Sequence, residues 1–164
     1  MSQIQGTESS RVKILVVDDE ELIRNLVVTF LSKVGHSCTT AMNGVDALNK
    51  MKTNKFDAII TDIKMPEMDG IFLIREISKH YPEIPVMVMT AYDEEYSAGT
   101  AISVGAREFI KKPFSPMEFI IRLQKMLSDS GALRRAESKK DGDEHVDGLI
   151  DELKAFLEKN KPLE

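Results

Sequence analysis

Five short segments with strand character alternate along the chain with five segments of helical periodicity, and this alternation limits the possible folds more than any other feature. The strand segments cover residues 12–17, 36–40, 56–62, 84–89 and 107–110. The helical segments cover residues 22–34, 43–54, 69–81, 93–105 and 115–130. Parallel strands need helical crossovers on the faces of their sheet, so the pattern predicts a doubly wound parallel α/β domain. For five such units we expect the flavodoxin-like strand order 2-1-3-4-5.

Composition narrows the class of protein. The chain has 164 residues, with 27 acidic and 22 basic side chains and a net charge of −5. This length suits one domain with a modest extension, and the mildly acidic balance argues against direct binding of nucleic acid. The single cysteine, Cys38, and a polar leader over residues 1–10 predict a cytoplasmic protein. No apolar run approaches the roughly 20 residues that a membrane span needs, so we expect no membrane insertion.

Carboxylates follow two strands that the predicted order makes neighbours. Asp18 and Asp19 follow the first strand, and Asp62 ends the third. In such a sheet, ligands bind beyond the carboxyl ends of the strands at the point where the strand order reverses. Three converging carboxylates repel one another, which raises their pKa values or requires a cation. Their oxygen atoms favour a hard cation, and Mg²⁺ suits them better than Ca²⁺ because no loop has the spacing of a calcium-binding EF-hand.

The fourth and fifth strands end beside the same edge. Thr90 supplies a hydroxyl and Lys112 an ammonium group, which suits phosphate. A cation, a lysine, a hydroxyl and an unliganded aspartate together favour phosphoryl transfer to Asp62 as an acyl phosphate. Each residue alone has a plain structural interpretation: Asp62 could cap a turn, Thr90 could be structural and Lys112 could be solvated. Their convergence at strand ends favours the chemical interpretation.

These residues, with Met65-Pro66, Asp69-Gly70, Ala91 and Pro113 in the same order and spacing, resemble the receiver domain of two-component response regulators. The similarity covers about residues 12–130. It implies that Asp62 is the phosphoacceptor, and that Asp18, Asp19, Asp62 and the backbone carbonyl of Lys64 bind Mg²⁺, with Mn²⁺ as a possible substitute. It also implies that Thr90 moves towards the phosphoryl group, that Lys112 contacts a phosphate oxygen, and that the Lys112-Pro113 bond is cis.

The same resemblance suggests roles for three further residues. Phe109 takes the place of an aromatic residue that moves inward on activation, and the alternative is that it is simply a packed strand aromatic. Lys64 and Tyr92, two residues after Asp62 and Thr90, match positions that modulate attack of water on the acyl phosphate. Both side chains are bulky, so we predict slow self-dephosphorylation, as suits a relay or a long-lived signal.

The end of the chain has a different composition. Residues 131–145 are mostly charged and are predicted to form a linker after a receiver domain at 11–130. Residues 146–160 have an apolar helical stripe that includes Leu153, Phe156 and Leu157. A helix this short is marginal alone in water, so it should dock on its own domain, pair with another copy, or order on a binding partner.

We therefore expect a phosphorylation-activated switch that receives its phosphoryl group from a sensor histidine kinase or a phosphotransfer protein. Its output would be binding of a downstream protein partner or a phosphorylation-dependent homodimer. One alternative is a fragment of a longer regulator that carries a DNA-binding or enzymatic output domain elsewhere. Another is a phosphohydrolase that works through an aspartyl phosphate, but its nucleophile would be expected on the first strand, so turnover of an external substrate is disfavoured.

Overall fold

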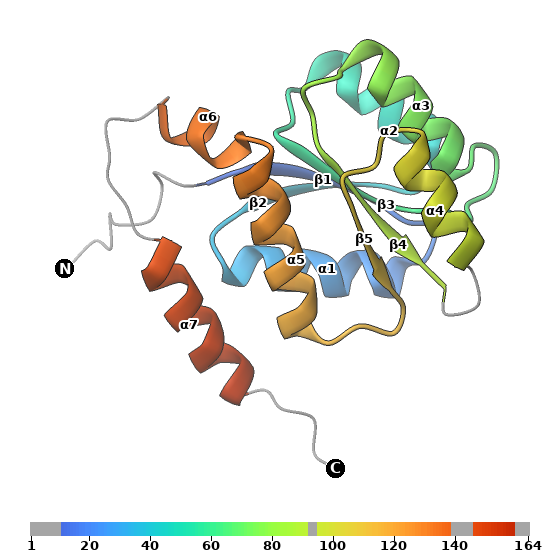
Figure 1. Ribbon diagram of the computed structural model, residues 1–164. Coiled ribbons are helices and arrows are strands. Elements are labelled where there is room, and N and C mark those ends of the chain that lie inside the picture. Colours follow the sequence, from blue (N-terminus) through green and yellow to red (C-terminus); the bar gives the residue numbers. More distant parts are fainter. Residues whose placement is uncertain (1–10, 92–94, 139–145, 160–164) are drawn as a thin grey trace.

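The computed structural model describes residues 11–91, 95–138 and 146–159. Five parallel strands form one sheet in the order β2-β1-β3-β4-β5, which confirms the predicted order (Figure 1). The strands are β1 (Lys13–Val17), β2 (Ser37–Ala41), β3 (Ala58–Asp62), β4 (Val86–Thr90) and β5 (Glu108–Lys111). The helices are α1 (Glu21–Lys33), α2 (Gly44–Thr53), α3 (Gly70–His80), α4 (Glu95–Ser103), α5 (Pro116–Asp129), α6 (Ala132–Ser138) and α7 (Val146–Lys159).

The sheet is the middle layer of three. Helices α1 and α5 cover one face, and α2, α3 and α4 cover the other (Figure 1). Successive residues of a strand point to opposite faces, so Ile14 and Val16 join the core under α1 and α5 while Leu15 and Val17 join the core under α2 and α3. The central strands β3 and β4 are buried throughout, as expected of a parallel sheet covered on both sides.

Side-chain caps fix where three of the helices begin. The side chains of Asn43, Asp69 and Ser115 each accept a hydrogen bond from a backbone N–H in the first turn of α2, α3 and α5 respectively. Pro116 occupies the first turn of α5, where its missing N–H costs no helical hydrogen bond. These caps set the helices directly after the loops that leave the carboxyl edge of the sheet.

One predicted detail of the domain is wrong, and other predicted segments lie outside the described residues. The helical spacing of Ile120, Ile121, Leu123 and Leu127 predicts that all four face the core from α5, but Ile121 is 58% exposed and lines the cavity between α5 and α7. The predicted leader over residues 1–10 lies outside the described residues, as do residues 92–94 before α4. In the described part of the chain, no helix is long and apolar enough to cross a membrane.

The prediction of a linker over residues 131–145 is wrong for residues 132–138. Residues 132–138 form α6, and Ala132, Leu133 and Ala136 are buried in the core under α1 and α5. These three small or apolar residues form a short stripe among charged neighbours. The charged composition of the segment as a whole therefore gave no indication of a buried helix. Arg135 also donates a hydrogen bond to the Glu83 carbonyl oxygen at 3.2 Å, which ties α6 to the loop before β4. Residues 139–145 lie outside the described residues.

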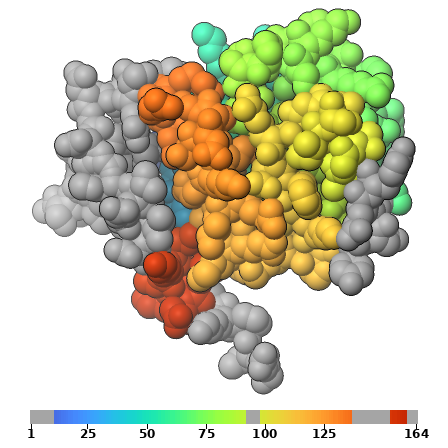
Figure 2. Space-filling model, in the orientation of Figure 1, coloured from blue at the N-terminus to red at the C-terminus, as the bar shows by residue number. Residues whose placement is uncertain are grey.

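Helix α7 docks on its own domain, the first of the three arrangements considered. Leu153 and Leu157 are buried in the same core as α1 and α5, and the ammonium group of Lys33 lies 5.2 Å from the ring centroid of Phe156. Figure 2 shows α7 against one end of α5. The contact is not completely filled, because an apolar cavity of about 160 Å³ remains between α5 and α7.

Candidate functional site

Three charged side chains from three strands meet beyond the carboxyl edge of the sheet. Asp18 follows β1, Asp62 ends β3 and Lys112 follows β5. The Lys112 ammonium group donates hydrogen bonds to Asp18 Oδ2 at 3.0 Å and to Asp62 Oδ2 at 3.2 Å. Asp18 is 0% exposed and Asp62 6% exposed. The structure thus brings together three of the predicted site residues in one largely buried ionic cluster.

Burial and charge oppose each other in this cluster. Burial raises the pKa of Asp62 above its ordinary value, the Lys112 charge acts in the opposite direction, and the Asp18 charge raises it again. For Lys112, burial alone would lower the pKa, but the charges of Asp62 and Asp18 outweigh it and raise the pKa. The lysine therefore stays charged and compensates for two carboxylates that have little access to water.

Backbone groups hold Asp62 in place. The Ile63 N–H donates to Asp62 Oδ1 at 2.7 Å, and the Thr61 hydroxyl donates to the Asp62 carbonyl oxygen at 2.9 Å. At Gly70, a Cβ atom would lie 2.1 Å from that same carbonyl oxygen, so only glycine fits there. The first residue of α3 thus packs directly against the backbone of the candidate phosphoacceptor.

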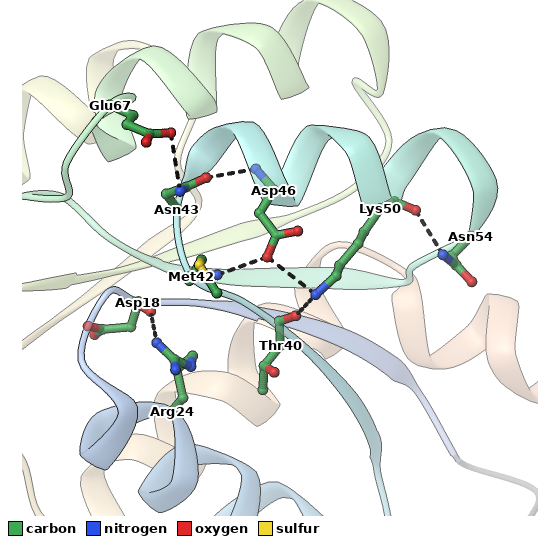
Figure 3. Close-up of polar contacts among 9 residues, drawn as sticks. All are labelled: Asp18, Arg24, Thr40, Met42, Asn43, Asp46, Lys50, Asn54 and Glu67. Atoms are coloured by element: carbon green, nitrogen blue, oxygen red, sulfur yellow. Dashed lines mark hydrogen bonds and ion pairs between the residues drawn. The ribbon is translucent and has the colours of Figure 1, made fainter.

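A second group of carboxylates lies on the β1–α1 connection. One oxygen each of Asp18, Asp19 and Glu20 lies within 4.8 Å of the others. The Glu20 N–H donates to Asp18 Oδ1 at 2.9 Å, and the Arg24 guanidinium donates to the Asp18 carbonyl oxygen at 2.7 Å (Figure 3). Asp19 and Glu20 are exposed, so hydrated oxygen ligands are available beside the buried pair. This all-oxygen donor set fits a hard divalent cation such as Mg²⁺.

Glu20 is a candidate site residue that the sequence analysis missed. Its signal was present, because Glu20 directly continues the acidic pair Asp18-Asp19 after β1. Of the predicted cation ligands, Asp18 and Asp19 lie in the oxygen cluster, whereas Asp62 is linked to Asp18 through Lys112. Lys64 lies two residues beyond Asp62, in the loop from β3 to α3, with its side chain exposed.

The remaining predicted residues lie on β4 and β5 or beyond them. Thr90 ends β4 and is fully buried, and its hydroxyl has no hydrogen-bond partner among the described residues. Phe109 on β5 is half-buried, with the Arg122 guanidinium 5.6 Å from its ring centroid. The Lys112-Pro113 bond is cis, as predicted. Tyr92 lies outside the described residues.

Comparison with known proteins identifies the class to which this fold and site belong. The family described as "Response regulator receiver domain" matches residues 14–124. The chain belongs to this family, as the resemblance predicted.

Individual relatives support the assignment. The chain is 34% identical over 142 residues to the alkaline phosphatase synthesis transcriptional regulatory protein PhoP of Bacillus subtilis, covering 87% of this chain and 59% of that protein. The crystal structure of the receiver domain of NtrX from Brucella abortus matches with a TM-score of 0.68 and 37% identity, over 70% of this chain and 98% of that one. A longer NtrX structure from the same organism matches with a TM-score of 0.72 and 31% identity, over 93% of this chain and 35% of that one. The chain spans about half the length of the curated relatives it matches.

Proposed function

We propose that this receiver domain is a phosphorylation-activated switch whose phosphoacceptor is Asp62. The observation that carries the proposal is the Lys112 ammonium group, which bridges Asp62 and Asp18 at 3.2 and 3.0 Å. This arrangement keeps a buried carboxylate beside a fixed positive charge, next to the exposed oxygen ligands of Asp19 and Glu20. Phosphoryl transfer requires an aligned nucleophile and positive charge around the transferred oxygens. In this proposal Asp62 is the nucleophile and Lys112 supplies part of the positive charge.

In the proposed reaction, an Asp62 carboxylate oxygen attacks the phosphorus atom of a phosphohistidine on a sensor kinase or a phosphotransfer protein. The phosphorus–nitrogen bond breaks, its electron pair stays on the imidazole, and Asp62 becomes an acyl phosphate. Mg²⁺, held by Asp18, Asp19, Asp62 and the Lys64 carbonyl, would supply positive charge to the phosphoryl oxygens. Glu20 adds a ligand to this set. Lys112 then exchanges its contact with the carboxylate for one with a phosphate oxygen.

Thr90 and Phe109 would carry the change to the surface. The Thr90 hydroxyl has no partner among the described residues, so a phosphoryl oxygen on Asp62 gives it an acceptor. Its movement leaves space that Phe109 enters from β5. Lys64 and Tyr92 would restrict the approach of water, which makes self-dephosphorylation slow. The resulting surface would bind a downstream protein in the cytoplasm or form a homodimer.

The proposal is tested by incubating the protein with acetyl phosphate and Mg²⁺ and measuring its intact mass. We expect one phosphoryl adduct on the parent, none on Asp62→Asn, and an unchanged adduct on the matched surface variant Asp129→Asn. An adduct on Asp62→Asn would contradict the assignment. Asp62-dependent release of inorganic phosphate from a simple phosphate monoester, beyond the amount of protein, would instead favour the phosphohydrolase alternative.

A second candidate is that the domain controls an output domain in a longer regulator. The observation that favours it is the length of the relatives, since the chain spans only 59% of a protein named as a transcriptional regulator. Size-exclusion chromatography with and without phosphorylation distinguishes output by dimer formation from output by another route. A phosphorylation-dependent dimer that Asp62→Asn does not form would support assembly as the signal. An unchanged elution volume would point to partner binding or to a separate output domain.

A further inference from the structure

The first residues of α2 contact the loop between β3 and α3, which spans residues 63–69. Gly44 is buried at the first position of α2. A Cβ atom on Gly44 would lie 2.7 Å from Met68 Sδ, 2.8 Å from Met68 Cγ and 2.9 Å from Met68 Cβ. The last of these atoms is fixed to the loop backbone, so rotation of the Met68 side chain alone would not relieve the clash. The missing side chain at Gly44 is what lets the loop lie against α2.

Asn43 makes a second contact with the same loop. Its Oδ1 atom accepts a hydrogen bond from the Asp46 N–H at 2.7 Å and so caps α2, while its Nδ2 atom donates to Glu67 Oε2 at 3.4 Å (Figure 3). Glu67 has a φ angle of +70°, the one positive value at a non-glycine residue in the part of the chain that the structure describes. That backbone conformation is uncommon for a residue with a side chain and persists where the surroundings hold it.

The loop is anchored to Asp62 at its base. The Gly70 N–H donates to the Ile63 carbonyl oxygen at 2.7 Å, and Gly70 lies directly against the Asp62 carbonyl oxygen. The loop is therefore held at its base, where Ile63 and Gly70 meet beside Asp62, and further along, where Glu67 and Met68 contact the start of α2. Lys64, whose carbonyl is a proposed cation ligand, lies between these two anchors.

We propose that Asn43, Gly44, Glu67 and Met68 form a clasp that positions the β3–α3 loop, and through it the Lys64 carbonyl and Asp62, for cation binding. The clasp residues are positioning residues and make no contact with the reacting atoms. The inference deepens the proposed function, and its cation-binding consequence rests on that function. The positioning of the loop does not rest on the proposed function, and it is tested separately.

The first experiment measures amide hydrogen exchange in the metal-free protein. Gly44→Ala should raise the exchange rates of the Met68 and Gly70 amides by roughly tenfold, because the loop can no longer seat on α2. Gly99→Ala is the matched control, since a Cβ atom there meets nothing within 4 Å. Unchanged protection of these two amides in Gly44→Ala, with the rest of the domain intact, would overturn the clasp.

The second experiment measures Mg²⁺ affinity by calorimetry. Gly44→Ala should weaken Mg²⁺ binding by roughly tenfold, the size of effect usual for residues that orient a metal ligand. The double variant Gly44→Ala with Met68→Ala should recover part of that loss, because it removes the Met68 Sδ and Cγ atoms and leaves only the contact with Cβ. No loss in Gly44→Ala, or the same loss in Gly99→Ala, would overturn the inference.

Asn43→Ser provides a variant that is expected to fold normally. Serine also caps helices well, so α2 keeps its first turn while the amide donor to Glu67 is lost. We expect a smaller loss of Mg²⁺ affinity, roughly threefold, with an unchanged melting temperature. Absence of Mg²⁺ binding by the parent would contradict the proposed function, whereas normal parental binding that none of these variants alters would contradict the clasp alone.

Discussion

Two buried polar centres lie at opposite edges of the same sheet. At the carboxyl edge, Lys112 is hydrogen-bonded to Asp18 and Asp62. At the amino edge, His36 is 3% exposed and accepts a hydrogen bond from the Val12 N–H through Nδ1, while its Nε2 atom has no partner among the described residues. One centre holds three charges that compensate one another, and the other holds a single titratable ring.

The two centres differ in which protonation state burial allows. Burial lowers the pKa of His36 to about 4, because the nearby Asp57 offsets little of the desolvation. The histidine is therefore neutral at pH 7. At the other edge, the carboxylates raise the pKa of Lys112 and keep it charged. Burial thus permits charge only where opposite charges are within hydrogen-bond distance, and a group without such partners stays neutral.

The largest expected effect comes from removing the positive charge of Lys112 at the carboxyl edge of the sheet. Lys112→Met should lower the free energy of unfolding by about 4 kcal/mol in metal-free buffer at pH 7, because two buried carboxylates lose their compensating charge. It should also raise the pKa of Asp62 further. Urea unfolding measures the change, and Mg²⁺ should restore part of the stability. Lys125→Met removes an exposed charge from α5 and serves as the control. Equal stability of the two variants would show that the cluster does not need its lysine.

The next effect tests the amino edge. The folded-state pKa of His36, about 4, lies below the unfolded value of 6.5. Between these values the unfolded chain takes up a proton that the folded protein does not, so stability is complete above pH 6.5 and falls as the pH drops towards 4. The loss attributable to His36 should reach about 3 kcal/mol. Comparing the pH dependence of unfolding with that of His36→Gln isolates it, and parallel profiles would refute the assignment.

The smallest effect compares two buried hydroxyls near Asp62. The Thr90 hydroxyl has no partner among the described residues, whereas the Thr61 hydroxyl donates to the Asp62 carbonyl oxygen. Thr61→Val should cost about 1 kcal/mol, and Thr90→Val should leave stability unchanged or slightly higher. Thermal unfolding checks both. A loss in Thr90→Val as large as that in Thr61→Val would mean that the Thr90 hydroxyl already has a partner in the resting protein.

The features that could be predicted from the sequence are those that repeat or follow from topology. The strand and helix periods defined the elements, and parallel strands necessarily bring their carboxyl ends to one edge, so the convergence of Asp18, Asp62 and Lys112 followed from the strand order alone. The helical segments predicted at residues 69–81 and 115–130 begin at the capping residues of α3 and α5, Asp69 and Ser115, because capping depends on local residue type.

The features that were missed depend on packing between distant segments. Helix α6 was hidden because its apolar stripe is only three residues within a charged stretch. Ile121 continues the apolar spacing of α5 but is exposed beside the cavity between α5 and α7. The fit of Met68 against Gly44 joins the start of α2 to the loop between β3 and α3, and no sequence period specifies their separation. Periodicity indicates which face of an element is buried, but the fit between neighbouring faces is set by their three-dimensional shapes.

The two ends of helix α1 lie beside different parts of the molecule, the acidic cluster and helix α7. Its first turn adjoins the carboxylates of Asp18, Asp19 and Glu20, and its last residue, Lys33, lies over the Phe156 ring of α7. At 1.5 Å per residue, its 13 residues span about 20 Å. Because α1 is one continuous helix, a tilt of its first turn would also move Lys33 and its contact with α7. A spectroscopic label on α7 would test whether cation binding at the carboxylates moves this contact.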